Sequence, residues 1–407
     1  MTRKLNSIVF ATFAVRSHGQ RTATNGMIEP MTYFFTKRSK RFTLIEQPHP
    51  GGDSVIPYLE AYKGARRVGC SRFFLSSFLL YPLLKLVHDQ STSPIFKIRD
   101  FLSVVEFVFF GNRRYDLFIG LEAVNAIAGI LLRKLGLVKT VVYYVSDYSP
   151  DRYKPKWVND LYLFLDRFAA KHSDFVWDVS LAMMPARIKV GLDPQKAAPL
   201  IHVPNALFPK QISYLPYSRV VPNSLVFVGT LGWINGPDLA IKALKIVLKS
   251  VPGATLHVYG SGEPDMTRLK RLTGKLKLGE KVVFHGFVSD QVKLSQETAK
   301  YMLGLAPYLA TPGSPRWWAD ATKTRLYLAA GLPVITTQVP PLGKEIERDG
   351  AGIIADDTPT SQAIAITKLL KNKVLYKKMR INAIKRARNN TWENTYKNAL
   401  RKMGYKI

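Results

Sequence analysis

The sequence predicts an α/β protein made of two doubly wound domains, and three observations support this fold class. The chain has 407 residues, which exceeds one ordinary hydrophobic core and suits two domains. Continuous apolar segments alternate with amphipathic helical segments, as a parallel sheet covered on both faces requires. Finally, residues 304–337 read as a strand, a Gly/Pro-rich loop, a helix and a second strand, a unit typical of parallel sheets.

The first half of the chain shows this alternation in order. We expect strands at 7–15, 41–46, 173–180 and 200–206, a strand followed by a helix within 115–136, a strand with its polar exit within 138–150, and helices at 27–36 and 157–171. A polar loop at 16–25 follows the first strand. Residues 48–112 are less regular, and we expect a loop there followed by two apolar helices, around 73–84 and 101–110. These elements predict one complete α/β domain.

The second half repeats the pattern. After a proline-bearing segment at 210–222, we expect a strand at the start of 224–244, a strand within 254–263 that ends in glycine, and strands at 281–288, 301–307 and 332–337. A glycine-bearing loop follows the first of these strands and leads into a helix that begins with Gly236, Pro237 and Asp238, which suit a first helical turn. A helix from about residue 319 to Gly331 and helices at 360–372, 373–388 and 390–403 complete the domain. Such helix starts hold phosphate groups in many proteins.

Charge is the most unusual feature of the composition. The net charge is +30, and residues 368–407 contain thirteen Lys and Arg but one acid, Glu393. This excess favours a polyanionic partner, and the two apolar segments at 73–84 and 101–110 favour a membrane surface over nucleic acid, for which no signature motif is present. A solvated helix face explains the basic residues equally well. We expect peripheral binding to an anionic membrane surface, and we do not expect nucleic acid as a partner.

The single cysteine and the N-terminus bear on the compartment. One cysteine, Cys70, cannot form an intramolecular disulfide, which favours a reducing cytoplasm. The basic start followed by an apolar run fits a first strand better than a signal peptide, since no small-residue cleavage site precedes Arg16. No run of about 18 apolar residues predicts a membrane-spanning helix. We therefore expect a cytoplasmic protein, peripheral on the inner face of the membrane.

Several motifs, taken together, resemble GT-B glycosyltransferases, and glycosyltransferase family four in particular. The segment Gly331-Leu332-Pro333-Val334 resembles the end of the donor-site helix of that family, and Gly229, Gly260, Gly262 and His285-Gly286-Phe287-Val288 match its donor-domain pattern. In the first half, Asp147, Ser173-Asp174, Ser180 and Val203-Pro204-Asn205 match recurrent acceptor-domain positions. The resemblance implies two Rossmann-like domains facing across a cleft, with the C-terminal helix returning to the first domain.

The sequence also departs from that family at charged positions. Trp318 and Leu326 stand where the family has two Glu residues, and Thr230 and Asn235 stand where it has the Arg and Lys that hold the donor diphosphate. These departures leave open a protein that binds a glycan or protein partner without transferring sugar.

The resemblance sets the expected domains and activity. It implies an acceptor-binding domain at 1–209, a linker at 210–222, a donor-binding domain at 223–389 and a C-terminal helix at 390–407. The expected reaction is transfer of a hexose, with retention, from a nucleotide-sugar donor to a lipid-linked, polysaccharide or other glycan acceptor, with no metal or other cofactor.

The candidate site residues follow from strand ends and motif positions. Asp320 could replace a missing sugar-binding Glu, although the first turn of a helix also favours Asp, and Asp147 could act on the acceptor or merely form a turn. Lys323 is the favoured cation for the leaving diphosphate, with Arg325 and Arg316 as further candidates. The expected donor-binding residues are Gly229, Thr230, Gly232, Gly260, Gly262, His285, Gly286, Phe287, Val288, Lys323 and Arg325. The expected acceptor-binding residues are His18, Gly19, Glu122 and Asn125, with no metal ligand.

Overall fold

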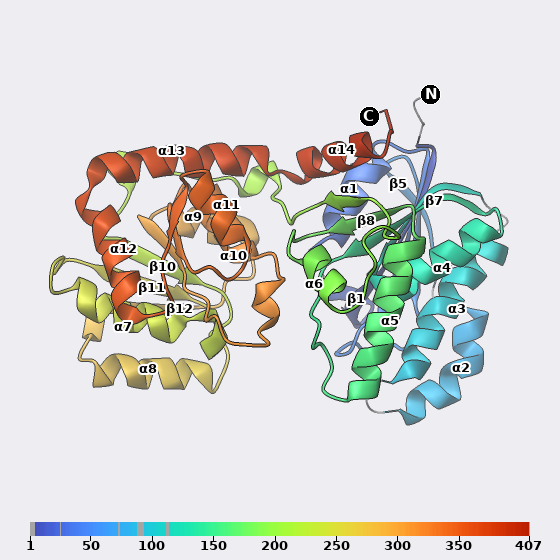
Figure 1. The fold of residues 1–407 in the computed structure, drawn as a ribbon, viewed down its shortest axis with the longest axis horizontal. Helices are drawn as coiled ribbons and strands as arrows, with labels where there is room; N and C mark the ends of the chain where they lie inside the picture. The colour runs from blue at the N-terminus through green and yellow to red at the C-terminus, as the bar shows by residue number, and fades with distance from the viewer. Residues whose placement is uncertain (1–4, 25, 72–73, 88–92, 111–113, 407) are drawn as a thin grey trace. The chain divides into compact units, whose positions relative to one another are not determined.

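The chain divides into two compact units, each with its own β-sheet, mostly parallel in unit 1 and fully parallel in unit 2 (Figure 1). The computed structural model describes residues 5–24, 26–71, 74–87, 93–110 and 114–406. Unit 1 comprises residues 1–204 and 395–407, and unit 2 comprises residues 205–394. The prediction of an α/β protein with two Rossmann-like sheets is confirmed.

Unit 1 contains a sheet of nine described strands in the order β5-β4-β3-β1-β6-β7-β8-β9, with β2 paired to β1. Its strands are β1 Ser7–Ser17, β2 Gln20–Thr24, β3 Arg41–Pro48, β4 Tyr58–Lys63, β5 Arg66–Ser71, β6 Tyr115–Leu121, β7 Val138–Val145, β8 Phe175–Asp178 and β9 Leu200–His202. Its helices are α1 Ile28–Thr36, α2 Leu75–Leu86, α3 Pro94–Phe110, α4 Glu122–Lys134, α5 Lys156–His172 and α6 Met183–Lys189. The strands from β3 to β9 along this order are parallel, as their apolar runs predict.

Two parts of unit 1 differ from the sequence prediction. Residues 16–24 are not a loop, because β2 turns back antiparallel onto β1. His18 and Gly19 form the two-residue turn, with φ of +49° and +77°, the left-handed geometry that suits a tight hairpin. Residues 58–71 form the antiparallel strands β4 and β5, whose mixed polar composition hides the strand pattern.

Unit 2 contains a fully parallel sheet in the order β12-β11-β10-β13-β14-β15. Its strands are β10 Ser224–Val228, β11 Thr255–Tyr259, β12 Val282–Gly286, β13 Leu303–Ala306, β14 Val334–Thr336 and β15 Gly352–Ile354. Its helices are α7 Pro237–Val247, α8 Asp265–Lys275, α9 Gln291–Thr298, α10 Thr322–Ala329, α11 Leu342–Arg348, α12 Pro359–Lys371 and α13 Lys373–Asn389, with short 3-10 turns at Pro209–Gln211, Tyr217–Arg219, Trp233–Asn235, Gly279–Lys281 and Pro315–Trp317.

Helices cover both faces of the unit 2 sheet. The apolar side chains of α7, α8 and α12 form one buried layer with Leu225, Phe227 and Leu305. Those of α9, α10 and α13 form another with Val226 and Val228 on the opposite face. Successive strand residues thus enter different layers, which fixes the strand register and brings every carboxyl strand end to one edge of the sheet.

The last helix, α14 Trp392–Lys402, carries the chain from unit 2 into unit 1. Tyr396 on this helix is fully buried, and its ring lies 5.3 Å from the Phe34 ring and 6.3 Å from the Trp177 ring, measured between centroids. Tyr405 donates or accepts a hydrogen bond with Thr140 of β7. Aromatic packing therefore attaches the C-terminal residues to the unit 1 sheet.

Candidate functional site

The glycine loop after β10 lies at the carboxyl edge of the unit 2 sheet. Gly229 has φ +130° and Gly236, the residue before α7, has φ +78°. A Cβ atom at Gly236 would lie 1.8 Å from the carbonyl oxygen of Pro307, so only glycine fits. Asn235 donates from Nδ2 to Thr230 Oγ1 across 2.7 Å, which closes the loop. Thr230 and Asn235, which stand where the resembled family has an Arg and a Lys, therefore bind each other.

Two further strand ends bring glycine backbones to the same edge. Gly260 donates from N to the Gly286 carbonyl, and a Cβ atom at Gly260 would lie 2.2 Å from the Gly229 carbonyl oxygen. Nothing lies within 4 Å of the Cβ position at Gly262, and near Gly232 only the tips of Asn235 and Asp265 come that close. The open backbone of these loops is accessible to a ligand that approaches the carboxyl edge.

The residues at the end of β12 and directly after it divide between exposed positions and the core. The His285 ring stacks on Tyr259 at 4.4 Å, and its Nε2 lies 3.0 Å from His257 Nδ1. Burial lowers the pKa of both histidines, and the neighbouring ring lowers that of His257 further, to about 4. Phe287 is exposed, whereas Val288 packs against the buried layer of α9 and α10. Of this group, the structure leaves His285 and Phe287 accessible.

Lys323 lies in the first turn of α10, and its ammonium lies between two aromatic rings. Nζ is 4.2 Å from the ring centroids of both Phe227 and Tyr308, and it donates to the Asn235 carbonyl across 3.3 Å. Burial lowers the pKa of this ammonium well below the ordinary range, and the charge of Arg316 lowers it further. Lys323 therefore joins α10 to the glycine loop.

Arg316 is a second cation of this edge. Its guanidinium lies 5.7 Å from the Tyr308 ring, and its Nε is buried without a hydrogen-bond partner among the described residues. No carboxylate of the described chain lies within 4 Å of the cationic nitrogens of Arg316 or Lys323. Two positive groups thus lie near each other without a compensating acid, which is an arrangement suited to an anion.

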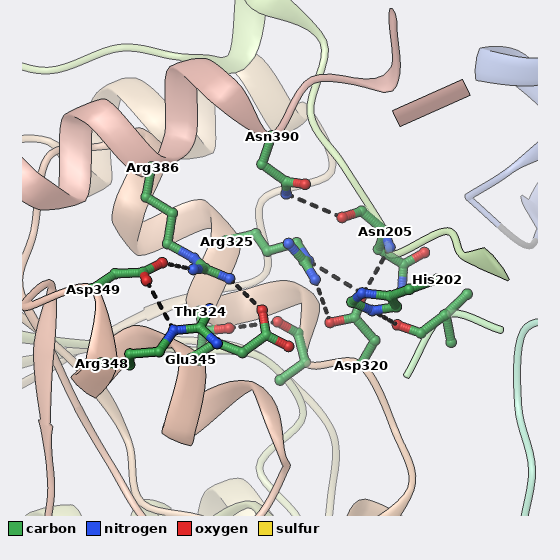
Figure 2. Close-up of polar contacts among 12 residues, drawn as sticks. His202, Asn205, Asp320, Thr324, Arg325, Glu345, Arg348, Asp349, Arg386 and Asn390 are labelled. Atoms are coloured by element: carbon green, nitrogen blue, oxygen red, sulfur yellow. Dashed lines mark hydrogen bonds and ion pairs between the residues drawn. The ribbon is translucent and has the colours of Figure 1, made fainter. Parts of the chain in front are cut away.

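Asp320 and Arg325 form a buried ion pair (Figure 2). The Arg325 guanidinium donates to the Asp320 carboxylate across 2.6 and 3.2 Å, and the Asn205 backbone N–H donates to the same carboxylate across 2.7 Å. The side chains are only 3% and 4% exposed. The helix α10 begins at Thr322 and not near Ala319 as predicted, since Ala321 before it is extended, with φ −77° and ψ 101°. Both side chains are occupied, so Asp320 acts as a clamp on Asn205 in this structure.

The first and last segments of unit 2, near residues 205 and 394, pair with each other close to this ion pair. Asn390 donates from Nδ2 to the Asn205 carbonyl, and Leu207 pairs with Thr391 in a parallel bridge. Figure 2 also shows Arg386 binding the carboxylates of Glu345 and Asp349. The first and last segments of unit 2 are therefore tied to α10 and α13.

In unit 1, polar groups gather at the carboxyl ends of β6 and β7. Glu122 accepts from Ser146 Oγ across 2.8 Å and from Ser146 N across 3.3 Å. Arg152 binds the carbonyl and the carboxylate of Asp147, across 2.8 and 3.3 Å. Burial raises the pKa of Glu122, although Arg152 and Ser146 oppose this. Sequence reasoning found Glu122 and Asp147 but missed Ser146 and Arg152, which only their place after a strand end could have indicated.

The other expected acceptor residues lie in two places. Asn125 is buried in the first turn of α4 and donates to the Leu121 carbonyl across 2.9 Å. His18 and Gly19 form the β1–β2 turn, where Asp53 accepts from the His18 backbone N–H. The structure thus brings Asn125 next to Glu122, whereas the described contacts do not join His18 or Gly19 to them.

A buried ion network below these strand ends was not predicted. Arg187 is fully buried and donates to Asp166 across 2.9 Å and to Asp178 across 2.6 Å. Asp166 also accepts from Tyr143 across 2.6 Å. This network joins α5, α6, β7 and β8, and a lone Arg in a short amphipathic helix gives no sequence signal for it.

The first predicted apolar segment forms α2, most of which is exposed, and residue 73 of that segment lies outside the described residues. Leu79 and Leu86 are 68% and 73% exposed. Other large apolar side chains of α2, α3 and α5 are exposed as well, namely Leu75, Phe78, Tyr81, Leu83, Ile98, Leu102, Phe109, Phe110, Trp157, Leu161 and Phe164. None of the described helices combines the length and hydropathy needed to cross a bilayer. Within the described chain, no group of three or more His, Cys, Asp or Glu side chains is placed to hold a metal ion.

Comparison with known protein families gives one match, which lies within the second unit. Residues 222–372 match the family model described as glycosyl transferases group 1. No curated protein sequence matches the chain.

Solved structures resemble the whole chain. HepE from Anabaena, solved in complex with UDP, matches with a TM-score of 0.69 at 14% identity, covering 98% of this chain and 99% of HepE. Sucrose-phosphate synthase from Thermosynechococcus elongatus matches with a TM-score of 0.65 at 14% identity, over 98% and 99% of the two chains. WaaG, a glycosyltransferase involved in lipopolysaccharide biosynthesis, matches with a TM-score of 0.60 at 16% identity, over 97% and 98%.

Proposed function

We propose that this chain, which has the GT-B fold and carries a group 1 glycosyltransferase domain at residues 222–372, transfers a sugar from a nucleotide-sugar donor to a glycan acceptor. The family match and the UDP held by HepE support a nucleotide-sugar donor. The observation that carries the proposal is the pair of cations without carboxylate partners, Lys323 and Arg316, at the carboxyl edge of the unit 2 sheet.

The donor diphosphate is the ligand that these cations suit. The leaving group gains negative charge as the bond between the sugar C1 and the phosphate oxygen breaks, so stabilising cations lower the barrier. Lys323 lies within hydrogen-bond reach of the glycine loop, through the Asn235 carbonyl, and the loop supplies backbone N–H groups at the start of α7. We assign the charge stabilisation to Lys323, Arg316 and this loop, and to no metal ion.

The finer parts of the proposal come from the resemblance to family four. They are transfer of a hexose with retention, and a lipid-linked or polysaccharide acceptor bound by unit 1. The donor-binding set includes the open glycines Gly232 and Gly262 and the accessible His285 and Phe287. We assign Asp320 and Arg325 to positioning the loop before α10, because the two side chains are already bound to each other.

We also propose that the protein binds the inner face of a membrane through α2 and α3. The exposed leucine and phenylalanine side chains of these helices would enter the lipid, since water disfavours so large an apolar surface. The basic residues of α12, α13 and α14 would add attraction to anionic lipids. This position suits a lipid-linked acceptor in a cytoplasmic enzyme.

One observation favours an alternative, a GT-B protein that binds a glycan or protein partner without transfer. Thr230 and Asn235 bind each other, and Trp318 and Leu326 replace the two Glu residues of family four. If Lys323 and Arg316 do not bind the donor diphosphate, the donor domain lacks the positive charge that transfer requires.

The test is thermal stabilisation by a panel of nucleoside diphosphates and nucleotide sugars. A ligand at 100 times its Kd stabilises the folded state by about 2.7 kcal/mol, which is easily measured. We expect stabilisation by at least one nucleoside diphosphate, and its loss in Lys323→Met but not in the exposed control Arg348→Met. Stabilisation by no nucleotide, or equal stabilisation by inorganic pyrophosphate and every nucleotide, would contradict the donor assignment.

A further inference from the structure

The junction between β6 and α4 places a glutamate in a backbone conformation that glycine prefers. Glu122 has φ +65°, directly after the last strand residue and at the first helical residue. The helix packs so closely on the strand that a Cβ atom at Gly120 would lie 2.5 Å from the Ala126 nitrogen. This direct turn from strand to helix forces residue 122 into the left-handed region, which is unfavourable for residues with a Cβ atom. A glycine would fit without strain, so the glutamate side chain needs another explanation.

The carboxylate of Glu122 is held by one of its two oxygens. Oε1 accepts both Ser146 hydrogen bonds, whereas none of the described residues gives Oε2 a hydrogen bond. The residue is only half-buried, so Oε2 is accessible to a ligand at the carboxyl ends of β6 and β7. Ser146 therefore fixes the direction of a carboxylate that keeps one free acceptor oxygen.

A buried amide next to Glu122 also lacks a partner. Asn125 is only 5% exposed, and its Nδ2 binds the Leu121 carbonyl, which places the amide beside the Leu121–Glu122 junction. Its Oδ1 is buried and has no hydrogen-bond partner among the described residues. On the segment that follows Ser146, the hydroxyls of Tyr148 and Ser149 are also buried and, in the described chain, unpaired. Buried polar groups of this kind ordinarily have a partner; Asn125 Oδ1 can only accept a hydrogen bond, whereas the two hydroxyls can donate or accept.

The charge around this group limits what can bind. The charged side chains that face Glu122 are Arg152 and Asp147, and the phenols of Tyr143 and Tyr162 are close enough to interact with it. Arg152 pairs with Asp147 and faces Glu122, so two carboxylates surround one cation. In a chain of net charge +30, this is a locally negative site. An anionic group would be repelled here, whereas an uncharged hydroxyl could donate a hydrogen bond.

We propose that Glu122, oriented by Ser146 and assisted by Asn125, binds an uncharged hydroxyl-bearing group of the acceptor, a neutral sugar or polyol, and not an acidic sugar or a phosphate. This proposal rests on the proposed function, and it deepens it by naming the acceptor chemistry. Glu122 Oε2 accepts a hydrogen bond from an acceptor hydroxyl, and Asn125 assists by holding the Leu121–Glu122 junction through its bond to the Leu121 carbonyl. The cost of the strained backbone is then tolerated because the carboxylate orients the acceptor.

The experiment compares three variants in a sugar-transfer assay in which the acceptor concentration is varied. Glu122→Gln keeps the shape but removes the charge, Glu122→Gly removes the side chain and relieves the strain, and Asp160→Asn removes an exposed carboxylate of α5 as a control. We expect kcat/KM for a neutral glycan acceptor to fall about 10- to 100-fold in both Glu122 variants, the value of a hydrogen bond to a charged group. Asp160→Asn should match the wild type.

Two further readouts separate acceptor binding from a structural role. Glu122→Gly should keep a melting temperature close to that of the wild type, because strain relief offsets the lost Ser146 bonds. In the wild type, acceptor KM should rise as the pH falls through the raised pKa of Glu122, because the protonated carboxyl loses its charge, and this dependence should be absent in Glu122→Gln. A large loss of stability in Glu122→Gly with an unchanged acceptor KM in Glu122→Gln would overturn the proposal, as would a preference for acidic acceptors.

The donor reaction keeps this test distinct from the test of the proposed function. Stabilisation by nucleoside diphosphates and slow donor hydrolysis should be unchanged in both Glu122 variants. If the wild type binds no nucleotide, the proposed function fails. If nucleotide binding is intact and acceptor KM does not respond to Glu122, only the acceptor assignment fails.

Discussion

At the scale of single residues, Lys323 carries most of the proposed donor chemistry. Its ammonium lies over two rings and binds the glycine loop, and no acid compensates it within the described chain. Replacing Lys323 by Ala should raise the activation free energy of sugar transfer by about 2 to 4 kcal/mol, the cost of deleting one preorganised group. The rate of transfer should fall accordingly. Single-turnover kinetics measures this. Arg348→Ala, which removes an exposed cation paired with Asp349, should leave the rate within about twofold of the wild type.

The environment of Lys323 also predicts a pH dependence. Burial and Arg316 lower its pKa, so it loses its charge at a lower pH than an ordinary lysine. Only the charged form attracts a diphosphate, hence nucleoside diphosphate affinity should fall as the pH rises through this lowered pKa. Calorimetric titration across pH 6 to 10 checks whether the affinity falls as the pH rises. The change near pH 6 that comes from protonation of the phosphate itself is left out of the comparison. An affinity that stays constant up to the ordinary lysine range would place the charge elsewhere.

The buried pair of Asp320 and Arg325 predicts a stability effect. Replacing Asp320 by Ala leaves the Arg325 guanidinium buried without its partner and should destabilise unit 2 by about 3 to 5 kcal/mol. As a control, Lys300→Met removes the ion pair between Lys300 and Glu297 and should lower the stability of unit 2 by at most about 1 kcal/mol. Denaturant unfolding followed by fluorescence distinguishes the two. Equal effects would show that the Asp320 clamp contributes little.

At the scale of elements, the glycine loop depends on close approach of two backbones. Gly236→Ala would place a Cβ atom 1.8 Å from the Pro307 carbonyl oxygen at a left-handed φ, so unit 2 should lose about 3 kcal/mol or more of stability. Gly274 of α8 is a matched control, because no atom lies within 4 Å of its Cβ position. Gly274→Ala should stabilise by about 0.5 to 1 kcal/mol through helix propensity. Thermal unfolding of both variants provides the comparison.

Most helices and central strands follow from the sequence, because their apolar periodicity matches the layers that they enter. The parallel strands β1, β6, β7, β10 and β13 are clear for this reason. The antiparallel strands β4 and β5 were missed, since β5 is exposed along its whole length and has no apolar face. The β1–β2 hairpin was missed because its turn, His18 and Gly19, is not one of the common two-residue signals.

The candidate site could also be predicted only in part from the sequence, for a different reason. Lys323 and Glu122 were named as candidates from strand ends and motif positions, because one edge of a parallel sheet collects such residues, and their roles stay predictions. The contact of Asp320 with the Asn205 backbone could not be predicted, since Asn205 is 115 residues away from Asp320 in the sequence. The strain at Glu122 depends on how closely α4 packs on β6, and no local pattern encodes that distance.

At the scale of the whole molecule, the proposed membrane attachment combines an apolar surface with a high net charge. Replacing Leu79 and Leu86 of α2 by Gln should weaken binding to vesicles containing anionic lipid, since each removes an exposed apolar side chain. Val221→Gln, which changes an exposed apolar residue outside the helices proposed to bind the membrane, serves as the control. Binding should also weaken with salt if the basic helices contribute. Co-sedimentation that is equal for neutral and anionic vesicles at low salt would contradict the electrostatic part.

The most direct measurement of the central claim is transfer itself. Purified protein is incubated with a labelled nucleotide sugar and a neutral glycan or lipid-linked acceptor, and labelled product and nucleoside diphosphate are counted together. We expect equal amounts of transferred sugar and released diphosphate, both strongly reduced in Lys323→Ala and retained in Arg348→Ala. Nucleotide binding without transfer to any acceptor would support the binding protein instead. Transfer at an unaltered rate in Lys323→Ala, with an intact fold, would contradict the donor site described for this chain.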